Sequence, residues 1–321
     1  MTNKHVLLVC DADRLRGSGH VMRMITLGSA LVELGAIVTL CAHTIPDSLR
    51  ELAISRLISV VPRTTPQHVD ELGQSLPAGD WQAVVFDGYE FASATFSLLH
   101  HSGHRVIVID DNGDHSNAAC SMIVNPNLHA DASMYETNES CSEYLLGADF
   151  ALIRNDIRMQ HIPDFDKRSG IFLGLGGTDA LDLSSRLSSA LSKHREWDIR
   201  QAQGVLNSAM SATSEMGLLL SQSRLGLIAF GTTTWEALHL GLPIIGVIVA
   251  DNQVLVAESV HKADLADVFD CRSNVNIDEI VVMMTERYGD SKLLMERSSL
   301  GQQLVDGNGA GRIADAILTS N

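Results

Sequence analysis

Residues 6–35 read VLLVCDADRLRGSGHVMRMITLGSALVELG, a short apolar run followed by a glycine-containing turn and a segment with helical periodicity. The run Val6–Val9 has the length and composition of a buried strand. After the turn, apolar side chains recur every three or four residues, as they do on one face of a helix. They are Val21, Met24, Leu27, Leu31 and Leu34. Gly35 then provides a typical C-terminal stop, so we expect a strand, a glycine-rich turn and a helix in succession.

Short apolar runs of the same kind recur through the first half of the chain. They are Ala36–Leu40, Ala83–Phe86, Arg105–Ile109 and Met122–Val124. Helical patterns separate several of them, and this alternation predicts a parallel sheet covered on both faces. A second series of runs lies in the second half, at Ile171–Leu173, Leu225–Ala229 and Ile244–Val249. Each half therefore opens with a strand, a glycine-rich turn and a helix.

This repeat predicts an α/β protein of two Rossmann-like domains with a cleft between them, where ligands bind beyond the carboxyl ends of the strands. The polar, charged segment Asn155–Ser169, which contains Pro163, is the expected linker. We expect an N-terminal domain over residues 1–158 and a C-terminal domain over residues 168–304. Residues 305–321 include the amphipathic stretch Gly311–Thr319 and are expected to form a C-terminal helix that packs back on the N-terminal domain.

Composition limits the classes of partner. The chain has 321 residues and a formal net charge of −16, which argues against nucleic acid as a partner, because that affinity depends on Lys and Arg neutralising phosphates. It leaves room for a small phosphorylated ligand, which a helix N-terminus can hold. The sequence contains no apolar run long enough for a membrane helix and no signal-peptide pattern. The five cysteines are scattered and form no C-x-x-C pair, so we expect a cytoplasmic protein.

The turn Gly17-Ser18-Gly19-His20 is the first candidate for chemistry. Glycines let the backbone approach a ligand closely, and the start of a helix favours negative charge. His20 would lie at that helix end, where we expect the helix dipole to disfavour its protonated form and keep it available as a general base. The alternative is an ordinary glycine-rich turn in which His20 is a polar cap. Asp11, Asp13 and Asp87 are the other possible bases, although an unperturbed carboxylate is poorly matched to neutral pH.

Two further glycine-containing turns follow strands in the second half. The segment Gly174–Asp179 is either a loop that faces a diphosphate or simply the cap of a helix. The segment Ala229–Leu238 is the stronger signal, because a turn of small residues, Gly231-Thr232-Thr233, presents N–H groups and hydroxyls to phosphate. Glu236 is expected in the first turn of the next helix, accepting hydrogen bonds from ribose hydroxyls. Its alternative role is to complement the helix dipole.

Several acidic pairs follow strands without forming a metal-ligand cluster. Asp11-Ala12-Asp13 has the D-x-D form of metal-dependent sugar transferases, but we favour a loop cap. Asp87-Gly88-Tyr89 and Asp110-Asp111-Asn112 also end strands, where carboxylates are more often turn formers than metal ligands. We therefore expect no metal and no cofactor.

Taken together, these motifs resemble the UDP-2,4-diacetamido-2,4,6-trideoxy-β-L-altropyranose hydrolases of pseudaminic acid biosynthesis. The resemblance covers nearly the whole chain, and its most specific parts are the G-x-G-H-x-x-R block at 17–23 and the T-W-E…A-D-N-Q blocks at 234–236 and 250–253. It also includes residues 86–89, 109–111, 124–127, 147–154, 176–179 and 306–310. The resemblance implies a GT-B fold and a metal-independent, inverting attack of water at the anomeric carbon of a UDP-linked amino-deoxy sugar.

The same resemblance assigns residues. His20 is the implied base, Tyr89 lies near the sugar, and Asp11 completes the expected catalytic set. The expected nucleotide- and substrate-binding residues are Gly17, Gly19, Gly176, Gly177, Gly231, Thr232, Thr233, Glu236, Asn252, Gln253 and Arg154. The chain departs from the family pattern at Val9, Asp13 and Gly231-Thr232-Thr233, and these departures concern the identity of the sugar more than the reaction.

Two other functions remain open from the sequence. One is a GT-B glycosyltransferase that uses a UDP-sugar donor, although the acidic chain lacks the membrane-facing patch of the lipid-linked GlcNAc transferases. The other is a non-catalytic nucleotide-sugar binding protein. The sequence does not define an oligomeric state.

Overall fold

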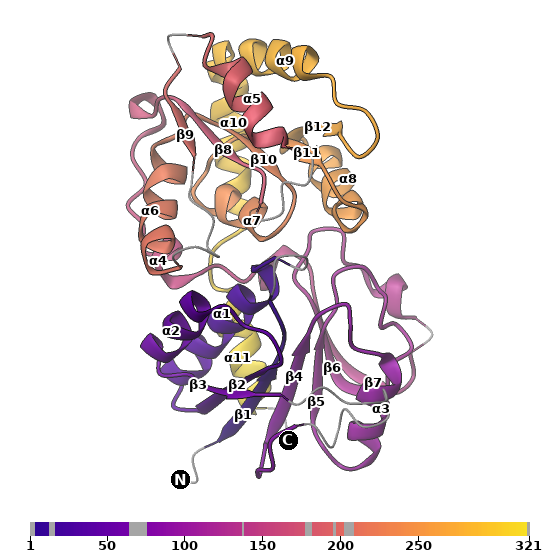
Figure 1. Ribbon diagram of the computed structural model, residues 1–321. Helices are drawn as coiled ribbons and strands as arrows, with labels where there is room; N and C mark the ends of the chain where they lie inside the picture. The colour runs from indigo at the N-terminus through magenta and orange to yellow at the C-terminus, as the bar shows by residue number, and fades with distance from the viewer. Residues whose placement is uncertain are drawn as a thin grey trace. The chain divides into compact units, whose positions relative to one another are not determined.

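The computed structural model describes residues 4–12, 17–63, 76–136, 138–176, 182–194, 197–201 and 209–319. The chain forms two compact units (Figure 1). Unit 1 comprises Met1–Leu152 and Asn308–Asn321, and unit 2 comprises Ile153–Gly307. Each unit is built on its own parallel sheet, so the expected pair of Rossmann-like α/β domains is confirmed.

Unit 1 contains a seven-stranded sheet in the order β3-β2-β1-β4-β5-β6-β7, in which all neighbouring strands are parallel. The strands are β1 (His5–Val9), β2 (Ile37–Ala42), β3 (Ser59–Pro62), β4 (Ala83–Asp87), β5 (Val106–Ile109), β6 (Cys120–Asn125) and β7 (Cys141–Leu146). The α-helices are α1 (Gly19–Glu33), α2 (Asp47–Ser55), α3 (Ser93–His101) and the C-terminal α11 (Gly309–Thr319). The short 3-10 helices η2 (Ala132–Tyr135) and η3 (Ala148–Phe150) belong to the same unit.

Alternation along the strands gives this sheet two buried faces. Leu7 and Val9 of β1 lie in one core cluster with Phe96 of α3. Leu8, which lies between them, points to the other face, where a Cβ atom on Gly28 of α1 would lie 3.1 Å from its Cδ1. Helices therefore cover both faces, with α1, α2 and α11 on one side and α3 on the other (Figure 1).

The chain returns to unit 1 at its C-terminal end. Helix α11 packs on α1, and its first residue, Gly309, lies against backbone atoms of Phe150 and Ala151. A Cβ at Gly309 would lie 2.3 Å from the carbonyl oxygen of Ala151, so this approach requires a glycine.

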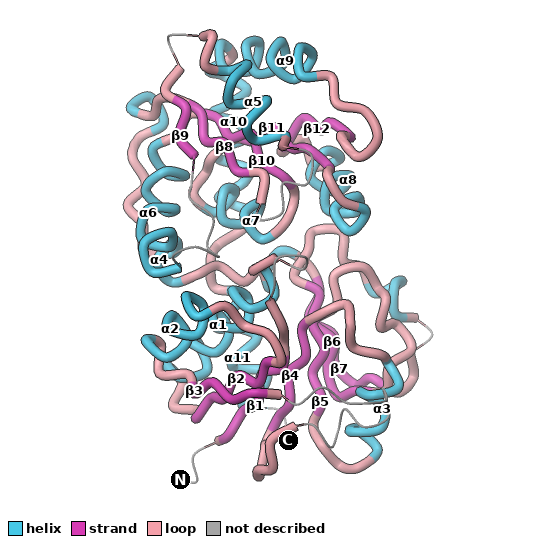
Figure 2. The backbone as a smooth tube through the Cα atoms, in the orientation of Figure 1, coloured by secondary structure: helices cyan, strands magenta, loops and turns pink. Residues whose placement is uncertain are grey.

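Unit 2 contains a five-stranded parallel sheet in the order β12-β11-β10-β8-β9. The strands are β8 (Ile171–Gly174), β9 (Ile199–Gln201), β10 (Leu225–Ala229), β11 (Ile244–Ile248) and β12 (Ala266–Asp270). The helices are α4 (Asn155–Arg158), α5 (Leu183–Leu191), α6 (Ala209–Gln222), α7 (Thr232–His239), α8 (Val254–Lys262), α9 (Ile277–Gly289) and α10 (Ser291–Leu304), with η4 (Phe165–Lys167) and η5 (Asp251–Gln253). Helices flank this sheet as well (Figure 2).

The expected linker, Asn155–Ser169, lies within unit 2 rather than outside both units. Its neighbour Arg154 pairs with Glu236 of α7, and Arg168 donates to the carbonyl oxygen of Gly241 at 2.7 Å. These bonds anchor both ends of the segment, whose polar composition suggested a free connection. No helix in the described ranges is both long and apolar enough to cross a membrane.

Candidate active site

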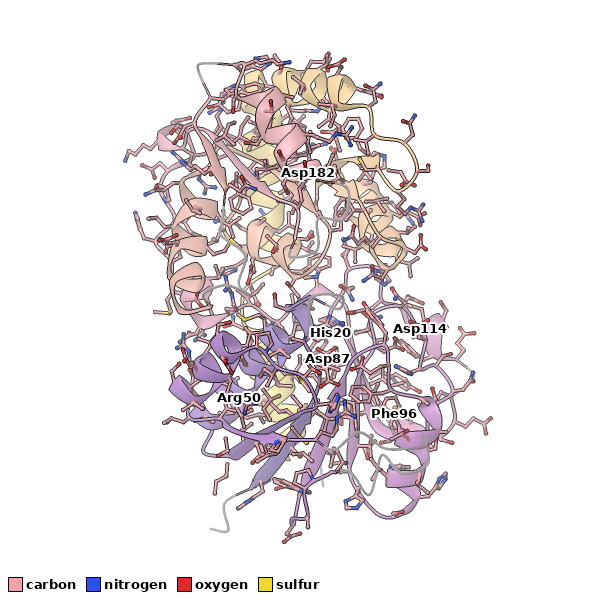
Figure 3. The ribbon with its side chains drawn as sticks, viewed as in Figure 1. His20, Arg50, Asp87, Phe96, Asp114 and Asp182 are labelled. Atoms are coloured by element: carbon pink, nitrogen blue, oxygen red, sulfur yellow. The ribbon has the colours of Figure 1, made fainter. Side chains whose placement is uncertain are left out.

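The order of the strands in unit 1 places a ligand site at one point of its sheet. The order reverses between β1 and β4, and in open α/β sheets ligands bind at such switch points, beyond the carboxyl ends of the strands. Helix α1 follows β1 and begins with Gly19 and His20, while β4 ends at Asp87. The switch point therefore brings the start of α1 to the end of β4 (Figure 3).

His20 and Asp87 form a hydrogen-bonded pair at this point. The distance from His20 Nδ1 to Asp87 Oδ1 is 2.7 Å, and Asp87 is buried. Because a carboxylate only accepts hydrogen bonds, the proton between them belongs to Nδ1. A neutral His20 then carries its lone pair on Nε2, the nitrogen that can take a proton from a substrate or water.

Arg23, one helical turn after His20, binds two carboxylates at once. Its Nε and Nη2 donate to Asp87 at 3.0 and 2.6 Å. Its Nη1 and Nη2 donate to Asp111 at 2.6 and 3.0 Å. Arg23 is buried, so these charge-assisted bonds are among the strongest contacts of the site.

Tyr89 completes the group with a ring that is 47% exposed. Its hydroxyl donates to Asp111 Oδ2 at 3.0 Å, and its ring meets that of His20 edge-on, with centroids 4.9 Å apart and planes at 85°. This half-exposed aromatic side chain adds apolar surface beside His20.

Two asparagines and a histidine support Asp111 from the far side. Asn127 donates to Asp111 Oδ1 at 2.9 Å, and Asn125 donates to its carbonyl oxygen at 3.2 Å. His129 Nε2 lies 2.8 Å from the same carbonyl oxygen. Asn125 ends β6 and the other two residues follow it, so the ends of the adjacent strands β4, β5 and β6 converge on one cluster.

Charge within the cluster sets the protonation of its members. Burial disfavours a protonated His20, but the neighbouring Asp87 carboxylate outweighs it and raises the pKa of His20 above 6.5. We expected the helix N-terminus to disfavour the protonated ring of His20. The net shift of its pKa has the opposite direction, because the Asp87 carboxylate dominates. Burial also opposes ionisation of Asp111, yet Arg23 outweighs it and holds the pKa of that carboxyl well below its usual range.

Asp11, the third expected catalytic residue, is buried and has a different set of partners. Its Oδ1 accepts hydrogen bonds from the backbone N–H groups of His43 and Thr44 at 2.6 and 2.9 Å, and its Oδ2 pairs with Arg63. These bonds fix the loop after β2 to the end of β1, which agrees with the expected loop cap. Asp13 lies outside the described residues.

In unit 2, the sequence-predicted residues gather at the carboxyl ends of β8, β10 and β11. Gly176, with a φ of +84°, follows β8, and Gly177 lies outside the described residues. Thr232 and Thr233 open α7, and the hydroxyl of Thr234 accepts from the N–H of Gly231 at 3.1 Å. The strand order reverses between β8 and β10, so these turns too flank a switch point.

Glu236 and Arg154 form a buried ion pair, with 2.7 Å between Arg154 Nε and Glu236 Oε1. Glu236 is the fifth residue of α7, so its expected place in the first turn is wrong by about one residue. Burial raises the pKa of Glu236, and the charge of Arg154 opposes that rise. A carboxylate offers about four acceptor sites, so a single bond from Arg154 fixes its orientation without saturating it.

Asn252 and Gln253 lie in η5, directly after β11. Gln253 Oε1 accepts from the N–H of Val249 at 2.8 Å, so it braces the turn that carries Asn252. Asn252 is exposed.

The sequence named Asp111 only as a strand-end carboxylate and Asp87 also as an alternative base, and it gave Arg23 no role beyond its place in the G-x-G-H-x-x-R block. One signal was present, since His20 and Arg23 are three residues apart and so share a helix face. Of the adjacent acidic pair, only Asp110 is a turn former, accepting from the N–H groups of residues 112, 113, 114 and 115. Its neighbour Asp111 turns the other way, toward Arg23.

Comparison with known proteins gives one sequence relative and many structural ones. No protein-family model matches the chain. It is 25% identical over 191 residues to the UDP-2,4-diacetamido-2,4,6-trideoxy-beta-L-altropyranose hydrolase of Campylobacter jejuni, over 59% of this chain. The match spans 66% of the length of that relative, just under two thirds.

Solved structures match over nearly the full length. A glycosyltransferase of kitacinnamycin has a TM-score of 0.69 at 16% identity, with 99% of both chains covered. MurG of Acinetobacter baumannii has a TM-score of 0.65 at 17% identity, with 99% of this chain and 100% of that chain covered. At these identities the likeness concerns the fold, and the chain has the GT-B fold of two parallel-sheet α/β domains.

Proposed function

We propose that this protein hydrolyses a UDP-linked amino-deoxy sugar and releases UDP and the free sugar without a metal ion. The observation that carries the proposal is the His20–Asp87 hydrogen bond of 2.7 Å at the switch point of unit 1. The sequence relative in Campylobacter jejuni, named as a hydrolase of a UDP-linked diacetamido-trideoxy sugar, supports this substrate class. A sugar such as 2,4-diacetamido-2,4,6-trideoxy-L-altrose, used for nonulosonic acid biosynthesis, is the candidate product.

The proposed step begins with a water molecule held by Nε2 of His20. The water oxygen attacks the anomeric carbon, and its proton passes to Nε2. The bond from the anomeric carbon to the diphosphate oxygen breaks on the opposite face, so the configuration inverts. UDP leaves with the bonding electron pair as an anion that a helix N-terminus can stabilise.

His20 is favoured over Asp11 as the base because of their surroundings. Asp11 is engaged by two backbone N–H groups and by Arg63. His20 instead has one nitrogen oriented by Asp87 and a pKa raised above 6.5, which makes Nε2 a stronger base than an ordinary imidazole. Asp87 has the role of the orienting carboxylate in a His–Asp pair.

For unit 2 we propose the nucleotide site. The turn Gly231-Thr232-Thr233 opens α7, whose first N–H groups lack helical partners and suit a diphosphate. Glu236, oriented by Arg154, would accept hydrogen bonds from ribose hydroxyls. Gly176, Asn252 and Gln253 would line the same edge of the sheet.

The test is to incubate the purified chain with a panel of UDP-sugars and to follow UDP release by chromatography. UDP release that requires no acceptor, with one ¹⁸O atom from labelled water at the anomeric carbon, is expected. UDP release that requires a sugar, lipid or small-molecule acceptor would replace hydrolysis by glycosyl transfer. The glycosyltransferases among the structural relatives are the reason to test this second function.

A further inference from the structure

Arg23 occupies the centre of the unit 1 cluster, yet it is too deeply placed to act on a substrate directly. It is 7% exposed and donates four hydrogen bonds of 2.6–3.0 Å to two different carboxylates. Asp87, on one side, holds His20, and Asp111, on the other, holds Tyr89. The two groups that face the site are therefore attached to one guanidinium through separate carboxylates, and Nη2 of Arg23 also lies 3.1 Å from Nδ1 of His20.

We infer that Arg23 is the positioning residue of this site, fixing the base through Asp87 and the exposed aromatic ring through Asp111, so that one side chain sets the geometry of both. The inference rests on the proposed function for the meaning of His20 as a base. The contacts that support it do not depend on any substrate.

Geometry argues that only arginine suits this position. The planar guanidinium reaches Asp87 through Nε and Nη2 and reaches Asp111 through Nη1 and Nη2, a fork on each side. A lysine offers a single nitrogen and cannot hold two carboxylates in two fixed orientations. Arg23→Lys would keep the charge and lose the double fork.

Charge argues for a second effect of Arg23 on His20. The groups that face His20 are Asp87 from β4, Asp111 from the turn after β5, Arg23 from its own helix and the ring of Tyr89. With a neutral His20, the formal charges of the two carboxylates and the guanidinium sum to −1. Without Arg23 the sum would be −2. Arg23 thus lowers the pKa of His20, whereas Asp87 and Asp111 raise it. Removing Arg23 or Asp111 should therefore move the titration of His20 in opposite directions.

The experiment is an NMR titration of the His20 ring in the full chain without ligand, the resonance being assigned by its loss in His20→Asn. We expect the His20 pKa to rise in Arg23→Gln and to fall in Asp111→Asn. Arg50→Gln, on α2 and away from His20 (Figure 3), is the matched control and should leave the titration unchanged. Thermal unfolding of each variant checks that it is folded.

A second readout tests the link to Tyr89. The edge-on contact at 4.9 Å should give a cross-peak between the two rings in a nuclear Overhauser spectrum. We expect this cross-peak to be lost in Arg23→Lys and Asp111→Asn and kept in Arg50→Gln.

An unchanged His20 pKa in both Arg23→Gln and Asp111→Asn would overturn the inference. If Arg23→Gln does not fold, the cross-peak between the His20 and Tyr89 rings in Arg23→Lys decides: its loss supports the inference and its retention overturns it. Because no readout uses substrate, failure here leaves the proposed hydrolysis standing, and failure of hydrolysis leaves this result standing.

Discussion

At the scale of single residues, four carboxylates at strand ends in unit 1 receive different roles from their surroundings. Asp110 accepts four backbone N–H groups and shapes a turn. Asp11 accepts two backbone N–H groups and pairs with Arg63. Asp87 accepts from His20 and Arg23, and Asp111 from Arg23 and Tyr89. Among these partners, the imidazole of His20 has an ordinary pKa nearest to neutral pH, so His20 is the favoured proton-transfer group.

Substitution of His20 tests its role directly. His20→Asn should lower turnover roughly a hundred- to ten-thousand-fold, the usual scale of general acid–base assistance. The affinity for UDP and the unfolding temperature should change little, because the proposed nucleotide site lies in unit 2. Steady-state kinetics with a UDP-sugar substrate measure turnover, and calorimetry measures the affinity for UDP and the unfolding temperature. Near wild-type turnover at saturating substrate would remove His20 from the mechanism.

The Asp87–His20 pair predicts a pH dependence. Neutral His20 is the active form, so kcat/KM should rise with pH through an apparent pKa above 6.5, because the Asp87 carboxylate outweighs burial and raises the pKa of His20. In Asp87→Asn the rise should shift to lower pH, since the charge is removed. Its plateau should also fall, because an amide can donate to Nδ1 and favour the wrong tautomer.

Asp114→Asn is the matched control for this profile. Asp114 is an exposed carboxylate of the same unit, and its substitution should leave the pH profile of the enzyme in place. If kcat/KM rose over the same pH range in wild type and in Asp87→Asn, the group that titrates would not be His20.

The role of Glu236 is best tested by substitution with glutamine. Removing the side chain would break the buried ion pair and leave Arg154 only the Asp156 carboxylate at 4.0 Å, at a cost of about 3–5 kcal/mol, and would confuse binding with folding. Glu236→Gln keeps an acceptor for Arg154 but weakens two charged bonds to ribose by about 2–3 kcal/mol in total. UDP binding should therefore weaken roughly 30- to 150-fold by calorimetry. Glu258→Gln, exposed on α8, should bind UDP normally; equal affinity in both variants would reject the assignment.

At the scale of elements, the ends of α1 and α2 differ in the residue that takes the left-handed conformation, a position that glycine usually occupies. Helix α1 ends with Gly35 at a φ of +86°, and the N–H groups of Gly35 and Ala36 donate to the carbonyl oxygens of Val32 and Leu31. Helix α2 ends in the same way, but its left-handed position holds Leu57, at a φ of +63°. A left-handed conformation costs a non-glycine residue roughly 1–2 kcal/mol.

Leu57→Gly should therefore stabilise unit 1 by about 0.5–1 kcal/mol, because glycine removes the strain but loses more conformational freedom on folding. Leu57 is 78% exposed, so little packing is lost. Leu34→Gly is the matched control at the end of α1, where φ is −86° and glycine should destabilise. Denaturant unfolding of both variants measures whether each substitution raises or lowers the free energy of unfolding. A lower value for Leu57→Gly would contradict the proposed strain at the end of α2.

The strands that the sequence did not predict share a position. They are β3, β7, β9 and β12, the edge strands of the two sheets. Edge strands such as β3 and β9 are half-buried or exposed along their length, whereas the central strands β4, β10 and β11 are buried throughout. An apolar run marks a strand only where neighbours cover both faces, so the central strands were predictable and the edges were not.

The site was predictable only in part for a related reason. His20 and Tyr89 were recognisable from their motifs, and the His20–Arg23 spacing lies within one helix. The partners of Arg23 lie 64 and 88 residues further along the chain and meet it only through the strand order β1-β4-β5. Local patterns carry no information on that order, so the cluster required the structure.

At the scale of the whole molecule, the two units have similar arrangements. In each, a parallel sheet reverses its strand order once, and the residues with chemistry follow the strands on either side of that point. Unit 1 supplies a polar cluster with a base and an exposed ring, and unit 2 supplies a glycine–threonine turn at a helix start with a buried carboxylate. Under the proposed function, unit 1 would act on the sugar and unit 2 would bind the nucleotide.

Hydrolysis by His20 without a metal ion can be tested in a single experiment. The purified chain is incubated with a UDP-linked diacetamido-trideoxy sugar in ¹⁸O-labelled water and EDTA, without acceptor, and early products are analysed by NMR and mass spectrometry. We expect UDP and a free sugar of inverted anomeric configuration, labelled once at the anomeric carbon. The rate should be unchanged by EDTA and should fall at least about a hundredfold in His20→Asn. Retained configuration, a rate restored only by magnesium or manganese, or equal rates for wild type and His20→Asn would contradict it.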